Sequence, residues 1–153
     1  DDRTDYIKRL IGLPGDTIQF INKELYINNK IIKKELITNT IDINCGNENL
    51  ETNFYKETLP NGKSYTAVYR KNGTMINSDK FTVPKNHYFF MGDNRDCSQD
   101  SRFLSSVGYV NFNNIVGKAQ LVFFSNDKYN GSFYKFWKWN KSLRINRFFK
   151  RIK

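Results

Sequence analysis

The chain has 153 residues and a formal net charge of +10, from 25 Lys and Arg against 15 Asp and Glu. This length allows one domain with a sizeable core, and the excess of cations is compatible with nucleic acid or an anionic lipid surface as partner. No run of about twenty apolar residues occurs, which excludes a membrane-spanning helix within these residues. Thirteen Phe and nine Tyr favour strands over helices.

The first 50 residues predict a β meander followed by a loop. Residues 5–12 read as a strand that ends in a Pro-Gly turn, and residues 17–21 alternate as a second strand does. Residues 24–27 and 30–33 flank an Asn-Asn pair and predict a hairpin. Residues 36–50 are polar and rich in Asn with weak periodicity, so we expect a long, irregular connection there.

A second hairpin is predicted in the middle of the chain. Residues 53–58 and 64–70 flank Pro60-Asn61-Gly62, and Asn-Gly between two such runs is a strong hairpin signal. Residues 80–83 and 87–91 are expected to return to the main sheet, and residues 115–124 to close it. The predicted fold is therefore mainly β, with residues 1–35 and 80–130 in the main domain and residues 36–79 as an inserted β-hairpin region.

Residues 131–153 form a basic, aromatic tail. Aromatic rings next to cations suit a membrane interface with anionic lipid, and on composition they suit nucleic acid equally well. A tail packed partly on its own domain is the third alternative. The aromatic members are Phe133, Tyr134, Phe136, Trp137, Trp139, Phe148 and Phe149, and the cations between them are Lys135, Lys138, Lys141, Arg144, Arg147, Lys150, Arg151 and Lys153.

The chain's two cysteines, Cys45 and Cys97, show neither metal-ligand spacing nor a redox motif. A bridge between them would require two loops to meet in space. We therefore expect two free thiols. No phosphate-binding glycine loop and no metal-ligand spacing occur in the sequence, and we expect neither a metal nor a cofactor.

Residues 91–102, MGDNRDCSQDSR, are the most informative segment. They contain three Asp, two Arg and two Ser and follow the apolar aromatic run 87–91. Residues this polar predict a loop that satisfies its own hydrogen bonds and positions another group, with forked Asp–Arg pairs fixing its geometry. A solvated turn is the simpler interpretation of the segment on its own.

Residues 5–16, DYIKRLIGLPGD, contain one lysine, Lys8, among the apolar residues Ile7, Leu10 and Ile11 of a strand-like run. Together the two segments resemble two signature boxes of bacterial type I signal peptidases, the membrane-anchored Ser–Lys proteases that remove secretory signal peptides. The family boxes read roughly Tyr-x-Lys-Arg-x-x-Gly-Leu-Pro-Gly-Asp and Gly-Asp-Asn-Arg-Asp-x-Ser-x-Asp-Ser-Arg. Both occur here in the expected order, and the resemblance covers most of residues 5–125.

The resemblance implies a role for each matching residue. Lys8 would be the general base, whose neutral amine takes the proton of a serine hydroxyl, and Ser98 would hydrogen-bond and orient it. Apolar burial favours the neutral form of a lysine. Tyr6 and Ile7 would line shallow pockets for small side chains upstream of the cleaved bond. The expected structural support consists of the pairs Arg9–Asp93 and Asp100–Arg102, with Asn94 and Arg95 maintaining the shape of the loop.

The family nucleophile lies in a Ser-Met-x-Pro box, and no such motif occurs between Asp1 and Lys153. The resemblance therefore implies that the nucleophile, most of the oxyanion hole and the membrane anchor lie outside this chain, which alone would be inactive. His87 is the sole histidine and has no carboxylate spaced to partner it, which argues against a His-dependent triad.

The function implied is a serine endopeptidase acting on exported preproteins, with its catalytic domain on the outer face of the bacterial cytoplasmic membrane. The tail would contact lipid, and the protein would be a monomer that does not bind nucleic acid. Two alternatives stay open: a basic β domain that binds single-stranded nucleic acid, and a related self-cleaving Ser–Lys peptidase. The Gly-Asp-Asn-Arg-Asp box argues against the second.

Overall fold

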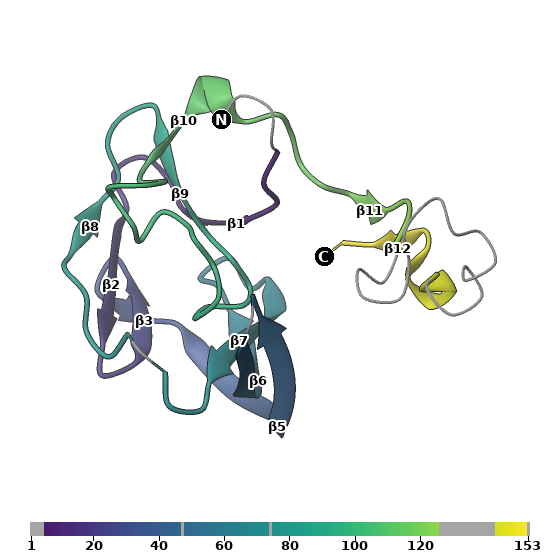
Figure 1. Cartoon of the computed structure of the whole chain (residues 1–153). Helices are drawn as coiled ribbons and strands as arrows, with labels where there is room; N and C mark the ends of the chain where they lie inside the picture. Colours follow the sequence, from purple (N-terminus) through teal and green to yellow (C-terminus); the bar gives the residue numbers. More distant parts are fainter. Residues whose placement is uncertain (1–4, 47, 74, 126–142, 153) are drawn as a thin grey trace. The chain divides into compact units, whose positions relative to one another are not determined.

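The computed structural model describes residues 5–46, 48–73, 75–125 and 143–152, and these are nearly all β strand, turn or extended chain (Figure 1). The mainly β class predicted from composition is confirmed. The chain divides into two compact units, Asp1–Val116 and Gly117–Lys153. No helix in the described ranges is long and apolar enough to cross a membrane.

Two small antiparallel sheets in the first unit contain the strands predicted for the first part of the chain, and β2, β3 and β4 follow one another as the meander predicted, whereas β1 pairs with β9 in the other sheet. One has the order β1-β9-β10 and the other β4-β3-β2-β8. Asn28 and Asn29 both have positive φ, 51° and 60°, which is the conformation that the tight turn between β3 and β4 requires. The bounds are β1 Arg9–Gly12, β2 Thr17–Ile21, β3 Glu24–Ile27, β4 Lys30–Ile31, β8 Phe81–Thr82, β9 His87–Met91 and β10 Val110–Asn111, followed by the 3-10 turn η1 Phe112–Asn114.

The third sheet is the long hairpin layer β5-β6-β7 of Figure 1, formed by Lys33–Cys45, Glu48–Thr58 and Ser64–Arg70. The β6–β7 hairpin was predicted, but the expected loop over residues 36–50 is wrong, because β5 fills most of it. Two register shifts, between Leu36 and Thr38 and between Thr38 and Ile41, interrupt the alternation of side chains along β5. Leu36, one of the apolar residues of this strand, is also 51% exposed and does not belong to a buried face.

One hydrophobic core joins the three sheets of the first unit. The alternating residues Ile18 and Phe20 of β2 point inward and are almost completely buried, as the strand period requires. Ala67 of β7 and Phe89 of β9 meet them in the same cluster. The polar residues that flank these strands are therefore fixed on a rigid support.

Within its described residues, 117–125 and 143–152, the second unit contains one short antiparallel pair, β11 Leu121–Val122 with β12 Lys150–Arg151, and the 3-10 turn η3 Ile145–Arg147. The predicted closing strand over residues 115–124 is wrong, since β11 is short and pairs with β12. Phe123 and Phe124 contact the rings of Phe149 and Phe148. The other aromatic residues of the tail, from Phe133 to Trp139, lie outside the described residues.

Candidate active site

The two polar segments of the sequence meet because β1 pairs with β9. Arg9 lies opposite Met91 and Leu10 opposite Phe90 in an antiparallel register. Lys8 immediately precedes β1, and the polar loop 92–102 immediately follows β9. The pairing therefore places Lys8 beside the loop, although more than eighty residues separate them in sequence.

Lys8 and Ser98 are in direct contact. The Lys8 Nζ donates to the Ser98 Oγ over 2.6 Å, and both residues are partly buried. Gly92 makes this approach possible, because a Cβ at that position would lie 2.1 Å from the Ser98 Oγ and 2.4 Å from its Cβ. The glycine in the loop motif thus provides the space that the serine side chain occupies.

Asp100 fixes the direction of the Ser98 hydroxyl. Its buried carboxylate accepts from the Gly92 backbone N–H at 2.9 Å and from two guanidinium nitrogens of Arg102, each at 2.8 Å. Burial disfavours the charged form, but the hydrogen bonds and charge of Arg102, with bonds from Gly92 and Ser98, outweigh it and lower the pKa of Asp100. An ionised carboxylate can only accept, so Ser98 donates to Asp100 and its oxygen is left to accept from Lys8.

Arg9 and Asp93 form the ion pair that the resemblance implied, and it ties the start of β1 to the loop. The Arg9 Nε donates to Oδ1 at 2.6 Å and its Nη2 to Oδ2 at 2.8 Å, the two-pronged geometry that orients both groups. The guanidinium also lies 4.0 Å above the centre of the Tyr65 ring. The hydrogen bond to Asp93 raises the pKa of Arg9 against the opposing effect of burial.

Arg95 crosses to the β6–β7 sheet and forms a buried network there. Its Nη2 donates to Glu57 at 2.6 Å and to the Tyr65 hydroxyl at 2.8 Å, and its Nη1 donates to the Tyr69 hydroxyl at 2.8 Å. Both tyrosines donate to Glu57. Burial raises the pKa of each tyrosine, which keeps its hydroxyl a donor. Burial acts to lower the pKa of Arg95, but the charge of Glu57 raises it overall.

The loop backbone is attached to β7 as well. The Val68 N–H donates to the carbonyl of Asp93 and the Arg95 N–H donates to the carbonyl of Val68, both over 2.8 Å, so Asn94 lies in a parallel bridge with Val68. The Arg102 guanidinium donates to the Arg95 carbonyl. The loop is therefore a braced structure and not a solvated turn.

The expectation for the cysteines is wrong, whereas the expected substrate contacts of Tyr6 and Ile7 stay a prediction. Tyr6 and Ile7 lie before β1 and are 73% and 78% exposed, so both are open to solvent. Cys45 and Cys97, expected as free thiols, form a disulfide with Cα atoms 5.7 Å apart, because the end of β5 reaches the polar loop. Among the described residues no group of three or more His, Cys, Asp or Glu is arranged to hold a metal ion.

Sequence reasoning did not identify Glu57, Tyr65 and Tyr69 as partners of the loop. Glu57 lies directly opposite Tyr65 across the β6–β7 pair, so the hairpin prediction brings these two together. Nothing in the local sequence indicates that Arg95 would cover them. The role of Gly92 was also not predicted, although the glycine that opens the Gly-Asp-Asn-Arg-Asp box could have indicated a close approach to the backbone.

Comparison with known proteins agrees with this geometry. Residues 1–124 match the family model described as "Signal peptidase, peptidase S26". The signal peptidase I of Rickettsia typhi is 40% identical over 162 residues, covering 96% of this chain and 59% of that protein. The Rickettsia bellii enzyme is 40% identical over 97% of this chain and 55% of its own length.

The chain thus spans little more than half the length of these relatives. A crystal structure of signal peptidase I from Enterococcus faecalis is 29% identical, covers 72% of this chain and 78% of that chain, and overlaps with a TM-score of 0.37. The assignment rests on the sequence matches, which include both segments that meet at Lys8 and Ser98. The chain belongs to the signal peptidase family, peptidase S26.

Proposed function

We propose that this chain supplies the general base of a serine endopeptidase that removes signal peptides from exported preproteins. The observation that carries the proposal is the 2.6 Å contact between the Lys8 Nζ and the Ser98 Oγ. The same Ser98 hydroxyl is hydrogen-bonded to Asp100, which fixes its direction. The Rickettsia relatives are named signal peptidase I, which supports the same reaction class.

In the proposed reaction the neutral amine of Lys8 takes the proton of a serine hydroxyl as that oxygen attacks the scissile carbonyl. The resulting ammonium donates the proton to the leaving amine, and the amine then activates a water that hydrolyses the acyl-enzyme. Ser98 accepts one N–H of Lys8, which orients the lone pair of the amine toward the attacking hydroxyl. No stretch of the 153 residues matches the Ser-Met-x-Pro box. We therefore infer that a segment other than these residues provides the nucleophile.

The supporting pairs have distinct tasks in this proposal. Arg9 and Asp93 keep the strand bearing Lys8 against the loop, and Asp100 with Arg102 keeps Ser98 in place. Asn94 and Arg95 fix the loop on the β6–β7 sheet. Each pair acts through geometry and does not touch the reacting atoms.

Tyr6 and Ile7 are proposed to contact the substrate residues just upstream of the cleaved bond. Their exposure leaves them free to be covered by a bound peptide. Shallow apolar contacts of this kind discriminate by size, and each extra methylene is worth only about 1–3 kcal/mol. The preference for small side chains there follows from the limited depth.

We further propose that this domain works on the outer face of the bacterial cytoplasmic membrane as a monomer. The Cys45–Cys97 disulfide supports the location, because disulfides persist in oxidising compartments and are rare in the cytosol. The basic aromatic tail, including Arg147, Phe148 and Phe149, supports contact with anionic lipid.

The test is Lys8→Ala in the enzyme that carries this chain together with the serine-bearing segment. Cleavage of a purified preprotein is expected to fall by at least ~10²-fold, the contribution of a general base. The matched control is Lys63→Ala, since Lys63 is an exposed lysine at the β6–β7 turn. Wild-type cleavage by Lys8→Ala would refute the assignment of the base.

The inactivity of the isolated chain is a separate test. The 153-residue protein alone is expected to leave the preprotein intact, because it contains the proposed base without the nucleophile. Mixing it with substrate at high enzyme concentration and following the product by mass spectrometry checks this. Cleavage that disappears in Lys8→Ala would show that a serine within the chain serves as nucleophile.

A further inference from the structure

Ser98 lies in the segment 96–101 of the polar loop, here called the arch. The C-terminal side of the arch is hydrogen-bonded to β9 and to Gly92, which follows it. Asp100 accepts from the Gly92 N–H at 2.9 Å, and the next residue, Ser101, donates its own N–H to the carbonyl of Phe90 at 3.0 Å. The Ser101 hydroxyl in turn accepts from the Phe90 N–H at 2.9 Å. These bonds fix the chain two residues after Ser98.

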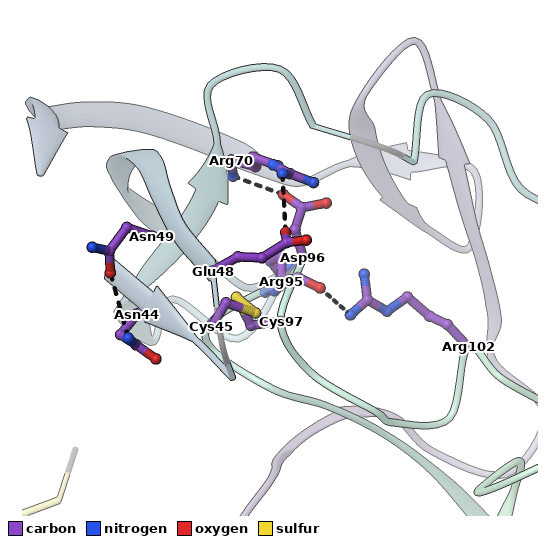
Figure 2. The surroundings of a disulfide bond; sticks show 9 residues. All are labelled: Asn44, Cys45, Glu48, Asn49, Arg70, Arg95, Asp96, Cys97 and Arg102. Carbon is purple, nitrogen blue, oxygen red and sulfur yellow. Dashed lines mark hydrogen bonds and ion pairs between the residues drawn. A yellow bond between two sulfur atoms is a disulfide. The ribbon is translucent and has the colours of Figure 1, made fainter. Parts of the chain in front are cut away.

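On its N-terminal side the loop is attached to the β5-β6-β7 sheet at Arg95, as described above, and again at Asp96 and Cys97, the two residues nearest to Ser98. The carboxylate of Asp96 accepts from the Arg70 N–H at 2.7 Å, at the end of β7. The next residue, Cys97, is bonded to Cys45, the last residue of β5 (Figure 2). Among the links to this sheet, the disulfide therefore lies nearest to Ser98 in the sequence, one residue away.

Two polar contacts of the β5–β6 turn lie near the disulfide, and both are weak. Glu48 pairs with the Arg70 guanidinium (Figure 2) over 3.7 Å. The Glu48 side chain is 73% exposed. An exposed ion pair of this length contributes little to stability. The Asn44–Asn49 bond, at 3.4 Å, joins the two strands of the turn and does not reach the loop. The disulfide is thus the covalent link of Cys97 to β5, and the bond from Arg70 to Asp96 holds the preceding residue to β7.

We propose that the Cys45–Cys97 disulfide positions Ser98 for its contact with Lys8, so that the redox state of this bond sets the catalytic rate. The inference rests on the proposed function, because it treats Ser98 as the residue that orients the base. Reduction by a dithiol transfers two electrons and two protons to the cystine and gives two thiols, while the dithiol becomes a disulfide. Ser98 then loses its nearest link to the β5-β6-β7 sheet while its hydrogen bond to Asp100 remains, and its Oγ spends less time at the Lys8 Nζ.

The kinetic test compares oxidised, dithiothreitol-reduced and reoxidised enzyme that carries this chain with the serine-bearing segment. We expect kcat to fall by about tenfold on reduction, with KM within twofold. A fixed 1 Å misplacement lowers the rate ~100-fold, and a loosened Ser98 is misplaced for only part of the time. Reoxidation restores the rate. Cys45→Ser is slow with or without dithiothreitol, and Lys8→Ala does not respond to it.

The structural test is amide hydrogen exchange, which does not require activity. Reduction is expected to increase exchange in the peptide covering residues 97–102 while β2 and β3 stay protected. Unchanged kcat together with unchanged exchange in residues 97–102 would overturn the inference. So would a rise that includes β2 and β3, because the bond would then serve general stability alone.

The two proposals fail in different ways. If Lys8→Ala cleaves as fast as wild type, the proposed base is wrong, and the exchange of residues 97–102 still decides whether the disulfide positions the arch. If Lys8→Ala is inactive and reduction changes neither kcat nor exchange, the base stands and the role of the disulfide is refuted.

Discussion

Gly92→Ala is the sharpest test of the site, because it adds one methyl group at the point where Ser98 approaches the backbone. The added Cβ would lie 2.1 Å from the Ser98 Oγ and 2.4 Å from the Ser98 Cβ. Rotation of the side chain moves the oxygen but not the Cβ, so the backbone of the arch has to shift. The disulfide at Cys97 and the hydrogen bonds of Asp100 oppose that shift.

The size of the effect follows from these distances. Ordinary van der Waals contact begins near 3.4 Å, so the Ser98 atoms must retreat by roughly 1 Å, and a misplacement of that size costs about 100-fold in rate. This equals about 2.7 kcal/mol of transition-state stabilisation. Overpacking is expected to lower the free energy of unfolding by about 1–3 kcal/mol, which leaves the enzyme folded at 25 °C if its stability is ordinary.

The assay measures kcat and KM for a preprotein substrate, with the folded fraction checked by circular dichroism. Gly117→Ala is the matched control, because a methyl group at Gly117 would meet nothing within 4 Å beyond its own chain neighbours, and its φ is not positive. We expect Gly92→Ala to lose kcat and keep KM, and Gly117→Ala to match wild type. A folded Gly92→Ala enzyme within threefold of the wild-type kcat would show that the Lys8–Ser98 contact is not needed.

Three further predictions concern stability. Glu57→Ala leaves the buried Arg95 charge without its carboxylate, so urea unfolding is expected to show a loss of about 3–5 kcal/mol, whereas the exposed Glu35→Ala changes little. Because the folded-state pKa of Asp100 is lowered, its ionised carboxylate stabilises the fold above about pH 4, and this stabilisation is lost as the pH falls below that value. The melting temperature of Asp100→Asn should therefore depend less on pH in this range than that of the wild type. Equal dependence of the two melting temperatures on pH would contradict this. Replacing both Cys45 and Cys97 by Ser removes a cross-link over 52 residues and is expected to lower the free energy of unfolding by up to about 4 kcal/mol, and an unchanged urea midpoint would count against that role.

Local patterns in the sequence determined the hairpins and, through the resemblance, the residues of the site. The Asn28-Asn29 and Asn61-Gly62 turns act within a few residues, because they depend on backbone conformations that those side chains tolerate. The two boxes sufficed to select Lys8 and Ser98 as candidates for the site. Their order along the chain could not show that they touch.

The tertiary structure alone decided the pairing of β5, the disulfide and the partners of Arg95. Strand β5 shows no apolar periodicity, because two register shifts interrupt the alternation of its side chains, and its pairing with β6 is what identifies it as a strand. The Cys45–Cys97 bond and the Arg95–Glu57 pair join residues 52 and 38 positions apart. Such partners are chosen by how the sheets pack around the common core, and that packing is a property of the whole chain, which no short window of sequence contains.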